Sequence, residues 1–76
     1  MKSKIKHEMR TRAQMLRGLV NLLRDDMEYI CSDVSDFDLV AMGESIREAK
    51  ETVQSIVDHM AELEYALYLT KRDDSA

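Results

Sequence analysis

The stretch Lys6–Thr11, KHEMRT, holds the residues of this chain whose types and spacing are most like those of a reactive site. A neutral imidazole nitrogen is nucleophilic at physiological pH, and a carboxylate beside it strengthens that tendency, so His7 followed by Glu8 is a candidate nucleophile with its acid. At 100° per residue, His7 lies about 170° from the mean direction of the nearby apolar residues, which points it toward solvent. The alternative is one more polar side chain on a hydrated helix face.

Residues 7–11, HEMRT, resemble the H box of histidine kinases. In that family a histidine on the first helix of a dimeric two-helix hairpin accepts a phosphoryl group, and the likeness extends loosely over residues 4–67. The resemblance implies His7 as the phosphoacceptor, Glu8 as the acid that orients the imidazole and takes its proton, and Thr11 as the residue that positions water for dephosphorylation. Arg10 belongs to the same motif.

Two features depart from the family's pattern. Arg12 stands where the family usually has a proline that kinks the helix. The sequence also has no glycine-rich nucleotide-binding box, so we expect no self-phosphorylation. The resemblance therefore leaves a free-standing acceptor, or a mimic that occupies the docking surface of a kinase or receiver domain.

The composition predicts an all-helical protein that needs support from another chain. The 76 residues, with no proline and two glycines, form one domain, residues 1–76, with few breakers against helix. Because a chain this short buries only about 60% of the surface its unfolded form exposes, a monomer would be marginal. The single cysteine, Cys31, excludes a disulfide framework, and His59 has no histidine or cysteine three or four positions on. We therefore expect no metal and no cofactor, and a homodimer as the source of stability.

The charge is unevenly distributed along the chain. The net charge is −4, yet residues 1–24 hold seven lysines and arginines against one acid, while residues 25–76 hold four against fourteen. No apolar run approaches the roughly 18 residues that a bilayer span requires, and no apolar block follows the basic start as in a signal peptide. We expect a cytoplasmic protein without a membrane partner.

Apolar residues recur every three or four positions, the heptad spacing of packed helices. The first seam is Ile5, Met9, Ala13, Leu16, Val20, Leu23, Met27, Ile30 and Val34, and the second is Leu39, Met42, Ile46, Ala49, Val53, Ile56, Met60, Leu63 and Leu67. Met15, Leu19 and Leu22 widen the first apolar arc beyond what one partner helix covers. We therefore predict these three residues as a dimer interface.

Serine and aspartate residues concentrate between the two seams, and their side chains compete for backbone hydrogen bonds. We place helix 1 at about 4–31, the turn at about 32–36, helix 2 at about 37–71 and a polar tail at 72–76. In this scheme Ser35 caps the second helix, with Asp38 completing a capping box, and Phe37 plugs the turn. A short connection makes the helices antiparallel, and we expect the two seams to face each other. The predicted fold class is an all-α two-helix hairpin that dimerises into a four-helix bundle.

Two groups of residues are candidates for binding a partner. Lys6, Arg10, Arg17 and Arg24 form a basic stripe beside the first seam, and Tyr65, Tyr68 and Leu69 leave the second seam near the open end of the hairpin. Amphipathic aromatic side chains beside cations are typical of protein-docking surfaces. The stripe alternatively pairs with acids of a neighbouring helix, or binds nucleic acid, which the negative net charge and the lack of interleaved aromatic residues disfavour.

These observations favour a small non-enzymatic module for protein–protein interaction. We expect a dimeric regulator, adaptor or inhibitor of a larger protein whose identity the sequence does not give. Short acidic helical proteins of this kind are common among bacterial and phage regulators, which is an analogy of shape. A histidine phosphoacceptor or mimic that uses His7 is the first alternative, and nucleic-acid binding through the basic face of the first helix is the second.

Overall fold

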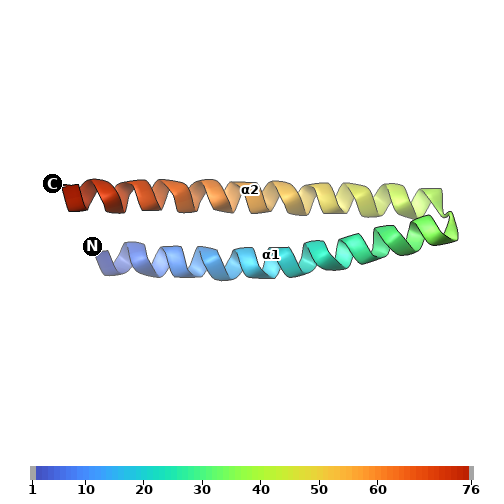
Figure 1. Ribbon diagram of the computed structural model, residues 1–76, viewed down its shortest axis with the longest axis horizontal. Helices are drawn as coiled ribbons and strands as arrows, with labels where there is room; N and C mark the ends of the chain where they lie inside the picture. Colours follow the sequence, from blue (N-terminus) through green and yellow to red (C-terminus); the bar gives the residue numbers. More distant parts are fainter. Residues whose placement is uncertain (1, 76) are drawn as a thin grey trace.

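The protein is an antiparallel hairpin of two long helices in the computed structural model (Figure 1). The structure describes the backbone of residues 2–75 and the side chains of residues 4–72. Helix α1 spans Lys2–Asp36 and α2 spans Leu39–Ser75. They form a rod of 58 × 14 × 12 Å in which the start of α1 and the end of α2 lie together at one end, opposite the turn (Figure 1). The predicted all-α hairpin is confirmed.

The connection is shorter than predicted and comes later in the chain. Helix α1 continues through residues 32–36, which we predicted as the turn, and only two residues separate it from α2. Phe37 adopts a left-handed backbone conformation with φ of 53°. Its N–H donates to the carbonyl of Val34 at 3.1 Å, and the N–H of Asp38 donates to the carbonyl of Asp33 at 3.0 Å. These two bonds form a Schellman motif, which ends α1 by satisfying its last carbonyl groups.

Asp38 is the residue that starts α2. Its carboxylate Oδ1 accepts a hydrogen bond from the backbone N–H of Ala41 at 3.1 Å, and its carbonyl accepts one from the N–H of Met42 at 2.9 Å. Asp38 is thus the N-cap, and the predicted capping box that began at Ser35 is wrong, because Ser35 is still within α1. The exposed Phe37 side chain also does not plug the turn.

The end of α2 lies further along the chain than the sequence suggested. The helix continues past Lys71 into residues 72–76, which we predicted as a polar tail, and it ends at Ser75. We placed the predicted end at the cations Lys71 and Arg72 because positive charge suits the dipole at the carboxyl end of a helix. They do not break a helix, and neither glycine nor proline follows them.

The two helices are rotated relative to the predicted packing of seam against seam. Half of each predicted seam faces the neighbouring helix, including Leu16 and Leu23 of α1 and Ala49 and Ile56 of α2. The other half is exposed, and the residue one position earlier, which is polar except at Leu19 and Ala66, takes its place at the interface. The displaced residues are Ala13, Val20, Met27 and Val34 in α1, and Ile46, Val53, Met60 and Leu67 in α2. The rotation directs an apolar stripe of each helix to the outside.

The hairpin consequently has a thin core. Among the described apolar residues only Ala49 and Ile56 are buried, and no described side chain is completely enclosed. The most deeply buried residue is an aspartate, Asp26, which is 2% exposed, followed by Thr52 at 5%. Two helices side by side can bury only one stripe each, so most of the apolar surface stays in contact with solvent.

Candidate functional site

Polar contacts hold the centre of the interface between the helices. The Thr52 hydroxyl lies 3.2 Å from Asp26 Oδ2 and 3.1 Å from the carbonyl oxygen of Glu48. A hydroxyl has one proton and can donate it to only one of these acceptors at a time. The buried Asp26 carboxylate therefore shares its hydrogen-bond donor with the backbone of α2.

Further polar contacts lie toward the two ends of the hairpin. Near the turn, the Ser45 hydroxyl donates to Asp33 Oδ2 at 2.8 Å. Toward the open end, Arg12 donates from Nη1 to His59 Nδ1 at 2.9 Å, while its Nη2 lies 4.0 Å from Glu62 Oε2. A guanidinium has no acceptor, so Nδ1 of His59 accepts and the ring proton is on Nε2. His59 is thus a hydrogen-bonded residue of the interface between the helices.

A continuous hydrophobic surface is exposed along both helices, and we call it the apolar face. Its members are Val20, Met27 and Val34 of α1 and Leu39, Ile46, Val53, Met60 and Leu67 of α2. On each helix they follow one another at steps of seven residues, which is two helical turns and keeps them on one side. Large side chains with 41–58% of their surface exposed therefore form two parallel rows along the hairpin.

A shallow groove at the middle of the apolar face shows that the two rows share one side of the hairpin. It has a volume of about 410 Å³, and Met27 of α1 lines it together with Ile46 and Val53 of α2. Leu23 and Ile30 are also part of its walls. Polar groups enter the groove only from Lys50 and Gln54 of α2. Such a surface suits the apolar side of another helix.

The predicted dimer residues lie away from this face. Met15 and Leu22 are 48% and 45% exposed, and they occupy the opposite side of α1. Leu19 is half-buried in the hairpin itself. On the matching side of α2 stand the charged residues Glu48 and Glu62, with the half-buried Leu69 toward the open end. The opposite face is amphipathic, whereas the apolar face is hydrophobic across both helices.

The structure brings together the residues that resemble an H box. His7, Glu8 and Thr11 line a shallow depression of about 360 Å³ together with Arg12 and Met15. His7 is exposed, as its position on the helical wheel indicated. The interaction that Arg12 makes with His59 ties this depression to the interface between the helices.

The predicted partner-binding residues do not form one patch. Arg10, Arg17 and Arg24 are exposed along the outer edge of the apolar face on α1, and within the described residues they form no ion pair. Lys6 is exposed near the open end. Helical spacing puts the exposed Tyr65 and Tyr68 on the side of α2 that faces away from α1, while Leu69 is half-buried. The aromatic and basic groups thus share the open half of the rod but not one surface.

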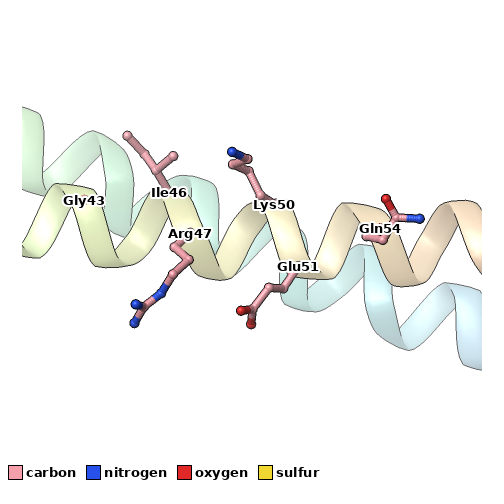
Figure 2. Close-up of a pocket in the computed structure, with 6 residues that line it drawn as sticks. All are labelled: Gly43, Ile46, Arg47, Lys50, Glu51 and Gln54. Carbon is pink, nitrogen blue, oxygen red and sulfur yellow. The ribbon is translucent and has the colours of Figure 1, made fainter.

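The remaining depressions are surfaces of a single helix. Figure 2 shows one of about 420 Å³ whose labelled residues all belong to α2, with Ile46 and Lys50 projecting from one side of the helix and Arg47 and Glu51 from the other. Side chains that diverge in this way do not converge on a small molecule. In the described part of the chain, no three histidine, cysteine or acidic side chains are grouped as metal ligands, and neither helix has an apolar stretch suited to crossing a bilayer.

The polar residues of the interface are those that the sequence analysis missed. Three polar pairs link the helices: Arg12 with His59, Asp26 with Thr52, and Asp33 with Ser45. A signal was present, because the three residues of α2 are spaced at intervals of seven, as are Asp26 and Asp33. Their polarity made them look like members of a solvent-exposed face.

No family model, no curated protein and no solved structure matches this chain. The likeness of residues 7–11 to an H box therefore stays a prediction. What the chain does has to be argued from its surfaces.

Proposed function

We propose that this protein is a non-enzymatic helical interaction module that acts as a regulator, adaptor or inhibitor of a larger protein. One observation carries the proposal. The apolar face exposes eight large hydrophobic side chains in two continuous rows, while only two apolar residues are buried among those whose side chains the structure describes. Contiguous apolar surface of this extent marks an interaction site on a soluble protein. Amphipathic helices that present such rows pack against the helices or grooves of other polypeptides.

Photo-cross-linking from the two sides of the hairpin tests this function. A benzophenone amino acid replaces Val53, at the middle of the apolar face, in cells that naturally express the protein. The matched control carries the same group in place of Asn21, an exposed residue on the outer side of α1. We expect cross-links to polypeptide from position 53 and far fewer from position 21. Equal yields from both positions, or none from position 53, would contradict an interaction role for the apolar face.

A second candidate function is that of a phosphoryl acceptor at His7. The observation that favours it is the exposed imidazole in a depression shared with Glu8 and Thr11. In the proposed step an imidazole nitrogen attacks the phosphorus of a phosphorylated donor protein or of ATP held by a separate kinase. A phosphorus–nitrogen bond forms, the bond from phosphorus to the donor's oxygen breaks, and the proton on the imidazole passes to Glu8. The donor leaves with the electron pair of the broken bond.

The test of this second function is labelling by a set of histidine kinases and phosphorylated receiver domains. The expected product is an acid-labile phosphate that disappears in His7→Gln, whereas His59→Gln, which removes the other histidine, keeps the label. Labelling that persists in His7→Gln would remove the proposal.

A further inference from the structure

We propose that the occupant of the apolar face is a second copy of this chain, packed face to face so that four helices enclose one core. The turns of both hairpins lie at the same end of this bundle, and α1 of each chain packs on α2 of the other. The inference rests on the proposed function of a helical interaction module, because it names the polypeptide that the apolar face binds. The form that regulates, adapts or inhibits a larger protein is then the dimer. It moves the dimer interface from Met15, Leu19 and Leu22 to the opposite side of the hairpin.

The exposed area of the single chain is larger than a stable monomer of its mass would show. The hairpin exposes 6220 Å². A compact monomer of 8.8 kDa exposes about 4,800 Å², so the surplus is roughly 1,400 Å² per chain. A stable interface covers about 800 Å² on each partner, so the surplus is more than large enough for one further copy packed along the rod.

The apolar face is suited to pack against itself. The register fixed by the Asp26–Thr52 and Asp33–Ser45 contacts puts Met27 at about the level of Val53, and Val20 at about the level of Met60. A twofold axis parallel to the rod preserves these levels, so side chains of similar size meet across the interface. No charged residue interrupts either row of the face, and contact between two copies therefore buries no unpaired charge in the centre. Lys50, at the rim of the groove, can extend its ammonium group into solvent.

The charges at the rim select between the two twofold arrangements. With the turns at opposite ends, α1 would pack on α1 of the other copy, and the rim arginines Arg10, Arg17 and Arg24 would face one another. With the turns at the same end, this rim instead lies over the rim of α2, where the register brings Arg17 within about one helical turn of Glu64 of the partner subunit. Arg10 then approaches Lys71 of the partner subunit near the open end, so the attraction depends on Arg17 and Glu64. Repulsion among three facing arginines opposes the first arrangement more strongly than the single approach of Arg10 to lysine opposes the second, which also gains the attraction of Arg17 to Glu64.

Sedimentation at micromolar concentration tests whether a second copy binds the apolar face. The native chain is expected at twice 8.8 kDa, and Val53→Lys should raise the dimer dissociation constant by about a hundredfold or more, because a charge would enter the centre of the core. The matched control is Met15→Lys, whose side chain is equally exposed on the opposite face and which should stay dimeric. A native monomer, or dissociation by Met15→Lys and not by Val53→Lys, would overturn the proposal.

A charge exchange makes the test independent of whether Val53→Lys folds. Arg17→Glu and Glu64→Arg should each weaken the dimer by about three- to tenfold, and the double variant should recover most of the native affinity. Both positions are exposed, so helicity measured by circular dichroism should not change in any of the three variants. Failure of the double variant to recover would refute the pairing of Arg17 with Glu64, and with it the arrangement proposed.

A distance between spin labels in the two copies measures whether their turns lie at the same end. In a Cys31→Ser background, Ser35→Cys provides one spin-label site close to the turn. Labels in the two copies should be less than about 35 Å apart if both turns share one end, and more than about 40 Å apart if they do not. The longer distance would refute the same-end arrangement. If the isolated chain is monomeric and position 53 cross-links to a different protein, the second copy is excluded while the interaction function stands.

Discussion

Phe37 shows how a single residue limits the stability of the hairpin. Its φ of 53° is a conformation in which a side chain costs about 1 kcal/mol relative to glycine. The ring is 78% exposed, so little burial offsets this cost. Helices that end in a Schellman motif commonly have glycine at this position. Phenylalanine at this position therefore lowers the free energy of unfolding relative to glycine.

We predict that Phe37→Gly stabilises the hairpin by about 1 kcal/mol. For a chain of this length the melting temperature should rise by roughly 4–8 °C in thermal denaturation followed by circular dichroism. Phe37→Ala is the matched control, since it removes the same ring but retains the Cβ atom that disfavours positive φ. An equal gain in both variants would show that the ring, and not the backbone conformation, is the source of the cost.

The shared hydroxyl proton of Thr52 leads to a second prediction. Thr52→Val keeps the shape of the side chain but leaves the buried Asp26 carboxylate without its donor, so the free energy of unfolding should fall by about 1–3 kcal/mol. Chemical denaturation measures this loss. Asp26→Leu combined with Thr52→Val should restore stability to near or above the native value. Replacing both members of the pair by apolar groups leaves no buried polar group without a hydrogen-bond partner. A double variant less stable than Thr52→Val alone would contradict this account of the interface.

At the scale of the helices, the sequence indicated the two elements and their antiparallel packing but not their rotation. The seven-residue repeat of apolar groups identifies both helices, since nothing in either segment breaks them. The rotation depends on pairs such as Ser45 with Asp33, which are adjacent only after the chain has folded back. The turn was misplaced for the same reason: Asp33, which looked like a turn residue, hydrogen-bonds to α2 from within α1. Tertiary contacts here override local preference.

The open end of the hairpin should depend on Arg12 more than on its neighbours. This side chain forms a polar link between α1 and α2 toward that end, through His59 and Glu62. We predict that Arg12→Gln accelerates amide hydrogen exchange over residues 4–13 and 59–70 by about two- to fivefold, which corresponds to a loss below about 1 kcal/mol for a partly exposed contact. Exchange near the turn should not change. Arg10→Gln is the control, because it removes the same charge from an exposed position, and equal acceleration in both variants would contradict a specific role for Arg12.

At the scale of the whole molecule, the small core and the large apolar face have a common origin. The hairpin directs polar pairs inward and an all-apolar stripe outward, an arrangement that disfavours a single chain but suits a bundle in which both stripes become core. In a four-helix bundle each helix contacts two neighbours, so the interface between α1 and α2 and the apolar face together supply the two contact surfaces that each helix requires. Polar groups such as Asp26 then fix which side of each helix faces which neighbour.

The proposed dimer couples folding to association and therefore predicts a melting temperature that depends on protein concentration. Unfolding about 76 residues absorbs roughly 50 kcal/mol per chain, or 100 kcal/mol per dimer, so a hundredfold rise in concentration should raise the melting temperature by roughly 10 °C. Scanning calorimetry measures the shift. Val53→Lys should melt at a lower temperature that does not depend on concentration, whereas Met15→Lys should follow the native chain. A native melting temperature independent of concentration would mean that the thin core suffices alone, and the apolar face would then be free for a partner of different sequence.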